Sequence, residues 1–224
     1  MASAAVQKRG KTTFGFSMPK PLAYLQFDSN YEFALADARK RYGADDISHR
    51  RYFADPTSDI KGANGAVWER FVKDYRYCVD NFRSVVVDTT SELLDVRKLA
   101  EFGRNTQILQ IYYGGFYADL RWMVKYATDH QANVNFVHRM KKEYRDDKWS
   151  GDYELEGWRG MVFEAPIYVE HNRDDESGVF TTTIKECSPN SMLVGTVLRS
   201  DEDENDFASL AKRIFPGTSK EDWE

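Results

Sequence analysis

The sequence has few cysteines and histidines and contains no long apolar run. Its two cysteines, Cys78 and Cys187, lie far apart and form no CxxC pair. This argues against a disulfide scaffold and a zinc finger and favours a reducing cytosol. Three of the four histidines, His49, His130 and His171, show no metal-ligand spacing. No apolar stretch approaches the roughly 18 residues that a spanning helix needs, and residues 1–13 lack the apolar core of a secretory signal. We therefore expect a cytoplasmic protein with no membrane contact.

The composition indicates one folded domain over residues 1–224. The chain is 42% hydrophobic and 14% aromatic, which excludes intrinsic disorder and allows one sizeable core. The net charge is -5, so no global field attracts nucleic acid. A local basic patch could still bind it, because the field near the site is what matters.

Apolar patterns alternate between strand and helix along the first two thirds of the chain. The patterns predict strands at 21–28, 84–88 and 133–138, and helices at 67–82 and 116–130. Strands that alternate with helices indicate an α/β fold, with a mostly parallel sheet and crossover helices. In such sheets ligands sit beyond the carboxyl ends of the strands, which here carry Asp28, Asp88 and His138.

The last third of the chain has a different pattern. Residues 161–172 and 178–187 read as two longer strands joined by a polar turn, an antiparallel hairpin that would extend one edge of the sheet. Residues 200–224 read as an acidic linker, DEDEND at 201–206, followed by a short helix to Phe215. The acidic run is either a solvated linker or a tail that competes with DNA for a basic surface.

A phosphate-binding signal stands near the N-terminus. Gly10, Lys11, Thr12 and Thr13 form the second half of the P-loop pattern G-x-x-x-x-G-K-[ST]. Glycine lets backbone amides approach phosphate oxygens, lysine reaches the β- and γ-phosphates, and the Thr12 hydroxyl ligates Mg²⁺. The first glycine of the pattern is replaced by Ala5, and residues 1–9 leave little room for the strand that normally precedes the loop.

Carboxylates follow two of the predicted strands. Residues 84–88, SVVVD, resemble a Walker B strand, whose final acid, Asp88, holds Mg²⁺ through water. Asp88 could instead cap the next helix, a role for which the following Thr-Thr-Ser competes. Glu92 is close enough in sequence to polarise a water or sense the metal. Asp28 suits metal and water activation at the same edge, or could cap residues 31–33. His138 is either a γ-phosphate contact or a surface histidine beside a basic loop.

Taken together, these motifs resemble a known group. GKTTFGFSMPKPLAYLQFD, SVVVDTTSELLD, NVNFVHRMKKEY and FPGTSKEDW are similar in order and spacing to the phage-type RecA-like P-loop ATPases. These compact single-domain proteins are associated with phage recombination and single-strand annealing. The resemblance runs from Gly10 to about Trp223. It implies a RecA-like P-loop NTPase core, ATP and Mg²⁺ as cofactors, a homo-oligomer, and the host cytoplasm for a phage-encoded protein.

The resemblance also implies residue roles. Lys11 and Thr12 would bind nucleotide phosphates and Mg²⁺, and Asp88 would be the Walker B acid. Asp28 or Glu92 would orient the attacking water, and His138 would occupy the sensor position.

The family's DNA loops follow the later strands. The candidates for contacts with single-stranded DNA are therefore the Arg104 region and Arg139, Lys141, Lys142 and Arg145. Residues 139–160 interleave basic groups with tyrosines and tryptophans, as single-strand binders do, although six acidic residues dilute the charge. A solvated loop is the other interpretation of this segment.

The departure at Ala5 leaves several alternatives open. Residues 1–9 could be truncated or non-native, the chain could be a split gene product, or the protein could have lost ATPase activity. In the last case it would be a non-enzymatic DNA-binding or interaction module with a degenerate Walker A site. A third function is a metal-dependent nuclease that uses Asp28, Asp88 and Glu92.

Overall fold

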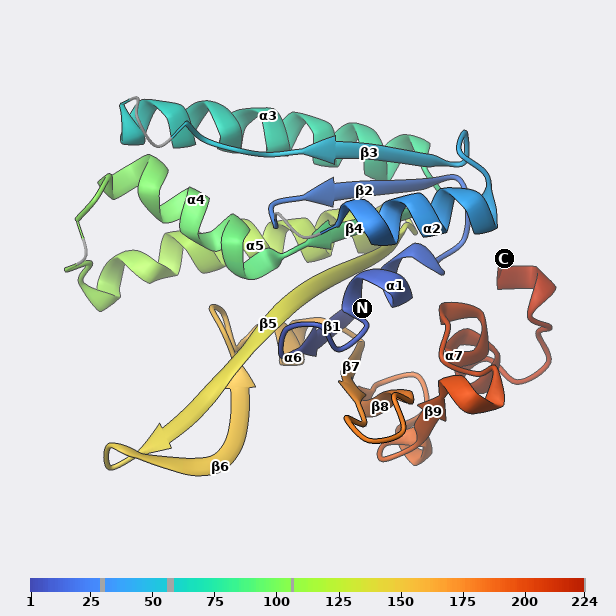
Figure 1. The fold of residues 1–224 in the computed structure, drawn as a ribbon. Coiled ribbons are helices and arrows are strands. Elements are labelled where there is room, and N and C mark those ends of the chain that lie inside the picture. The colour runs from blue at the N-terminus through green and yellow to red at the C-terminus, as the bar shows by residue number, and fades with distance from the viewer. Residues whose placement is uncertain (29–30, 56–58, 106, 224) are drawn as a thin grey trace.

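The computed structural model describes residues 1–28, 31–55, 59–105 and 107–223 (Figure 1). Within these residues nine strands form a sheet in the order β3-β2-β4-β5-β1-β7-β8-β9, and β6 pairs with β5. The strands are β1 Ala2–Ala5, β2 Leu22–Gln26, β3 Ile47–Arg51, β4 Ser84–Asp88, β5 Asn133–Arg145, β6 Lys148–Leu155, β7 Ile167–Arg173, β8 Phe180–Cys187 and β9 Val197–Arg199.

The strands from β3 to β7 along this order run parallel, whereas β8, β9 and β6 each pair antiparallel with their neighbours. The α-helices are α1 Lys11–Phe16, α2 Glu32–Tyr42, α3 Ile60–Asn81, α4 Thr90–Phe102, α5 Tyr113–Asp129, α6 Met161–Glu164 and α7 Phe207–Ile214. Short 3₁₀ turns lie at Gln110–Tyr112, Ser191–Leu193, Ser200–Glu202 and Glu221–Trp223. The predicted α/β class with a mostly parallel sheet is confirmed.

Helices cover both faces of the sheet. Because side chains alternate along each strand, successive residues pack against helices on opposite faces. On β4, Val85 and Val87 pack against α3, α4 and α5, whereas Val86 points to the opposite face, against α1 and α2. The C-terminal helix α7 packs on this second face and buries Leu210 and Ile214 there.

The strand that precedes the phosphate loop is present, contrary to the sequence-based expectation. Residues 2–5, ASAA, form β1 at the centre of the sheet, in register with β5 on one side and β7 on the other. Alanine and serine are weak strand formers. Here small side chains suit a strand that is fully buried on both faces, and the two neighbouring strands supply its hydrogen bonds.

The other predicted elements are found with shifted ends. The predicted helix at 67–82 begins earlier, at Ile60, because the Asp59 side chain accepts hydrogen bonds from Lys61 N and Gly62 N and so caps α3. The predicted hairpin is β7 and β8, which extend the sheet beyond β1, but residues 161–164 form α6 instead of strand. The strand predicted at 133–138 continues to Arg145, since β6 pairs with its second half.

The acidic segment near the C-terminus is tied to the fold. Asp206 caps α7 by accepting a hydrogen bond from Ser209 N, and Lys220 lies 3.3 Å from its carboxylate. Phe207 N donates to the Ser17 hydroxyl at the end of α1, at 2.8 Å. Residues 201–206 thus include a helix cap, a role that neither sequence-based interpretation, a solvated linker or a tail that competes with DNA, had given them.

Candidate active site

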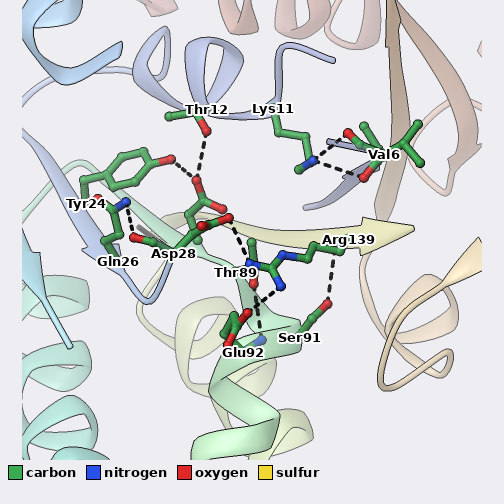
Figure 2. Close-up of polar contacts among 12 residues, drawn as sticks. Val6, Lys11, Thr12, Tyr24, Gln26, Asp28, Thr89, Ser91, Glu92 and Arg139 are labelled. Atoms are coloured by element: carbon green, nitrogen blue, oxygen red, sulfur yellow. Dashed lines mark hydrogen bonds and ion pairs between the residues drawn. The ribbon is translucent and has the colours of Figure 1, made fainter. Parts of the chain in front are cut away.

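A pocket of about 240 Å³ opens at the carboxyl ends of the central strands. The loop between β1 and α1 and the start of α1 form one wall. Asp28 after β2, Asp88 of β4 and Arg139 of β5 line the other (Figure 2), and Phe180 of β8 completes the lining. Its lining comprises Gln7, Lys8, Arg9, Gly10, Lys11, Thr12, Thr13, Asp28, Asp88, Arg139 and Phe180. All four residues of the Gly10–Thr13 motif therefore line one cavity together with two of the predicted carboxylates.

The two glycine positions of the P-loop pattern have different backbone requirements. Gly10 has φ 92°, a left-handed conformation that disfavours a side chain, and a Cβ there would lie 2.9 Å from the Phe180 ring. Ala5, at the position of the first glycine, is the last residue of β1 and has extended backbone. An alanine satisfies this position without strain.

Lys11 points back along the loop that precedes it. Its Nζ donates to the carbonyl oxygens of Ala5 at 3.0 Å and Val6 at 2.9 Å (Figure 2). The side chain is largely buried, and this burial lowers its pKa, although the nearby carboxylates of Asp88 and Asp28 oppose the shift. An ammonium group that lines the pocket and donates to two neutral carbonyls is suited to exchange those bonds for phosphate oxygens.

Asp88 lines the pocket and accepts hydrogen bonds from two hydroxyl groups. Thr12 Oγ1 donates to its Oδ2 at 3.1 Å, and Tyr24 donates to the same oxygen from β2. Burial raises the pKa of Asp88, and both of these hydrogen bonds act in the opposite direction. Asp88 does not cap the next helix: the Thr89 side chain does so by accepting from Glu92 N at 3.2 Å.

Asp28 follows β2 and lines the pocket on the side opposite the phosphate loop. Gln26, fully buried on β2, donates from Nε2 to the Asp28 carbonyl at 2.7 Å, and its Oε1 lies 2.8 Å from His49 Nε2. These bonds fix the backbone that presents the carboxylate. Asp28 Oδ2 in turn accepts from Arg139 Nη2 at 3.1 Å.

Arg139 is the cation between two carboxylates. Its other guanidinium nitrogen, Nη1, pairs with Glu92 in the first turn of α4 (Figure 2). Its backbone N donates to Ser91 Oγ at 3.2 Å. Arg139 lines the pocket because β5 pairs with β1 as far as Arg139, opposite Ala5, where the phosphate loop begins. Its contact with DNA stays a prediction.

His138 does not end a strand, and the expectation that placed it at a strand end is wrong. It lies within β5, opposite Ala4 of β1, and only 1% of its surface is exposed. Successive residues of a strand point to opposite faces, so His138 and Arg139 diverge, and only Arg139 lines the pocket. Burial lowers the pKa of His138 to about 4.

No protein-family model and no curated protein matches this sequence. Among solved structures, the crystal structure of the RadB recombinase is similar, with a TM-score of 0.55 and 16% sequence identity. The match covers 88% of this chain and 85% of that chain. The fold is RecA-like. At this level of identity the likeness concerns the fold, and the chemistry must be argued from the residues themselves.

The other three predicted DNA contacts lie together on the hairpin of β5 and β6, which extends from the RecA-like core (Figure 1). Lys141 pairs with Glu154 at 3.5 Å, and Arg145 with Glu143 at 3.1 Å. The Lys142 Nζ lies 4.7 Å from the centre of the Trp149 ring. Tyr144, Trp149 and Tyr153 expose between 43% and 62% of their surface, so the hairpin presents aromatic faces beside cations.

Two residues that line or support the pocket, Tyr24 and Phe180, were not predicted from the sequence. Tyr24 sits inside an apolar strand, where an aromatic residue is ordinarily core, and its hydroxyl role depends on the register of β2 with β4. Phe180 is distant in sequence and reaches the loop only through the order of β1, β7 and β8. Neither carries a motif signal.

The proposed three-acid metal site does not form as a cluster. Among the residues that the structure describes, no three His, Cys, Asp or Glu side chains are placed to hold a metal ion. Arg139 stands between Asp28 and Glu92 instead.

Across the part of the chain that the structure describes, no helix is both long and apolar enough to cross a membrane.

Proposed function

We propose that this protein binds ATP with Mg²⁺ and hydrolyses it as a RecA-type ATPase that acts in DNA recombination on single-stranded DNA. One observation carries the proposal: Lys11, Thr12 and Asp88 meet in one pocket beneath a glycine loop, and a hydrogen bond of 3.1 Å joins the last two. This is the residue set that a triphosphate with a divalent cation requires.

The donor set fits the cation. A threonine hydroxyl and an aspartate carboxylate are hard oxygen donors of the kind that Mg²⁺ prefers. Thr12 and Asp88 would hold it, and Mg²⁺ bound there neutralises charge on the β- and γ-phosphates. Thr12 Oγ1 donates to Asp88 Oδ2 at 3.1 Å, so the two residues that would hold the cation are already in contact.

The remaining residues of the pocket have separate proposed roles. Lys11 exchanges its two carbonyl partners for phosphate oxygens, and the backbone of residues 6–10 encloses the phosphates. Asp28 is the carboxylate that orients the attacking water and accepts its proton, since it faces the pocket from the side opposite the loop. Arg139 supplies positive charge next to Asp28, where charge on the terminal phosphate must be offset.

DNA binding is assigned to the hairpin of β5 and β6. Cations that follow a phosphate backbone and aromatic faces that stack on bases are the two elements of single-strand binding. Lys141, Lys142 and Arg145 provide the first, and Tyr144 and Trp149 the second. A homo-oligomer and a phage origin, both implied by the family resemblance, stay predictions.

The decisive experiment is titration with a fluorescent ATP analogue, with and without Mg²⁺. We expect Mg²⁺-dependent binding that Lys11→Ala abolishes. Lys20→Ala is the matched control, because Lys20 stands after the other end of α1 and also donates to two backbone carbonyls. Absence of binding in the wild type, or unchanged affinity in Lys11→Ala, contradicts the proposal and favours the non-enzymatic module.

A further inference from the structure

We infer that Phe180 forms the nucleobase subsite of this pocket and stacks on the purine of the bound nucleoside triphosphate. The inference rests on the proposed function and deepens it. Among the described residues that line the pocket, Phe180 is the one aromatic side chain; the others are polar, charged or glycine. A flat apolar face in an otherwise polar cavity is suited to a base and not to phosphates.

The order of the strands gives the pocket two different ends. Asp28 follows β2, whereas Asp88 and Arg139 belong to β4 and β5, and these three strands all lie on one side of β1. Phe180 begins β8, which lies beyond β7 on the other side of β1. A triphosphate whose terminal phosphate faces the charged end therefore directs its base toward Phe180.

The ring is held against the phosphate loop itself. Its edge lies so close to Gly10 that a Cβ there would be 2.9 Å from a ring carbon. The Phe180 backbone N donates to Ser200 Oγ at 3.0 Å, which fixes the start of β8. A base that contacts this ring is thus within reach of the loop that encloses the phosphates.

A second group supports the ring from the neighbouring strand. Arg173 pairs in register with Phe180 across β7 and β8, and its guanidinium carbon lies 5.4 Å from the ring centre. Arg9, from the phosphate loop, donates to the Arg173 carbonyl and pairs with Asp175 at 2.7 Å. The loop and the hairpin turn are joined, so the aromatic face is in place before a ligand binds.

Calorimetric titration with two probes tests the inference: MgATP, which has a base, and magnesium tripolyphosphate, which has none. The variant is Phe180→Leu, because leucine keeps apolar contact with Gly10 but removes the aromatic face. We expect its affinity for MgATP to fall about tenfold, as loss of one base–aromatic stack predicts. Its affinity for tripolyphosphate should stay unchanged, and Phe180→Tyr should restore MgATP binding.

Two controls separate the possible results. Phe163→Leu changes an exposed phenylalanine on α6, outside the pocket lining, and should alter neither affinity. Lys11→Ala should weaken both probes, because it removes the phosphate contact. Equal losses for both probes in Phe180→Leu, or no loss in either, overturn the base subsite while leaving the phosphate site intact. Failure of the wild type to bind either probe refutes the proposed function itself.

Discussion

Arg139 and Asp28 form an ion pair across the end of β4: Nη2 lies 3.1 Å from Oδ2, although β4 separates their strands in the sheet. Both side chains are about three quarters buried, so the pair is less screened than a surface pair. Arg139 also pairs with Glu92. The charge of Arg139 therefore compensates two carboxylates. The terminal phosphate, which is also negatively charged, is proposed to bind beside them.

Replacing Arg139 should weaken nucleotide binding. In Arg139→Gln, Asp28 and Glu92 lose their cation, and their charge then repels the triphosphate. We expect the affinity for MgATP to fall about tenfold, which corresponds to the roughly 1.4 kcal/mol of a modest partly buried charge interaction. Arg145→Gln, on the exposed hairpin, is the matched control for loss of one arginine. Equal affinity in the two variants would argue against a charge role for Arg139 in the pocket.

Nucleotide binding should depend on pH through Asp88. Burial raises the pKa of this carboxyl, and only its ionised form can hold a divalent cation. MgATP affinity should therefore decrease as pH falls toward that raised pKa. In Tyr24→Phe the carboxylate loses a hydrogen bond that lowers its pKa, so the midpoint of the decrease should move to higher pH.

Calorimetric titration at a series of pH values measures this midpoint. Tyr52→Phe is the control, because Tyr52 also donates to an aspartate, Asp74, at 2.8 Å, outside the pocket. A midpoint that moves equally in Tyr24→Phe and Tyr52→Phe would show that the Asp88 contact is not the cause.

Acid should destabilise the fold through its buried histidines. Burial lowers the pKa of His138 from 6.5 to about 4, and burial, aided by the charge of Lys11, lowers that of His171 to about 3. Below pH 6.5 these two histidines bind protons in the unfolded chain but stay neutral in the folded chain. The free energy of unfolding should therefore fall as pH drops, by about 3 kcal/mol for His138 alone.

Urea unfolding across this pH range, with His138→Gln beside the wild type, tests the assignment. The variant has no group to titrate at this position, so its stability should decline less steeply between pH 6.5 and 4. Parallel curves for the two proteins would mean that His138 does not contribute.

The hairpin of β5 and β6 should contribute stacking and charge separately. Trp149→Ala removes an exposed aromatic face and should lower single-stranded DNA affinity about tenfold with the salt dependence unchanged. Lys142→Ala should instead reduce the salt slope by about one ion. Fluorescence anisotropy of a labelled oligonucleotide at several salt concentrations distinguishes the two, and Phe163→Ala serves as a control aromatic. Unaltered binding in both hairpin variants would move the DNA site elsewhere.

Restoring the missing glycine should bring no gain. In Ala5→Gly we expect unchanged ATP affinity, because the residue is extended and needs no left-handed backbone. Stability should fall by about 1 kcal/mol, the usual cost of glycine in a strand interior. Thermal unfolding and an ATP titration measure both quantities, and a marked rise in affinity would show that Ala5 impairs the loop.

Local patterns were sufficient to predict the residues that carry their own signal. Lys11 and Thr12 stand in a contiguous motif, and Asp88 ends a β-branched run, so each could be found without knowing the sheet. Their shared pocket confirms that they come together, whereas their roles stay predictions. β1 was missed because four small residues have weak strand propensity, and its burial between β5 and β7 outweighs that propensity.

The remaining contacts depend on register, which no local pattern reveals. The strand expected to end at His138 continues because β6 pairs with charged residues that look like a loop. That extension, together with alternation along β5, decides that Arg139 and not His138 faces the pocket. Tyr24 reaches Asp88 only because β2 and β4 are neighbours.

The unequal demands on the two ends of the phosphate loop widen the range of sequences that can build it. Of the two glycine positions of the pattern, Gly10 combines a left-handed backbone with an aromatic ring at contact distance, so that position disfavours a side chain. Ala5 needs no more than a small residue, because both faces of its strand are covered. A pattern that insists on both glycines is therefore stricter than the geometry, and proteins with the same loop can fall outside it.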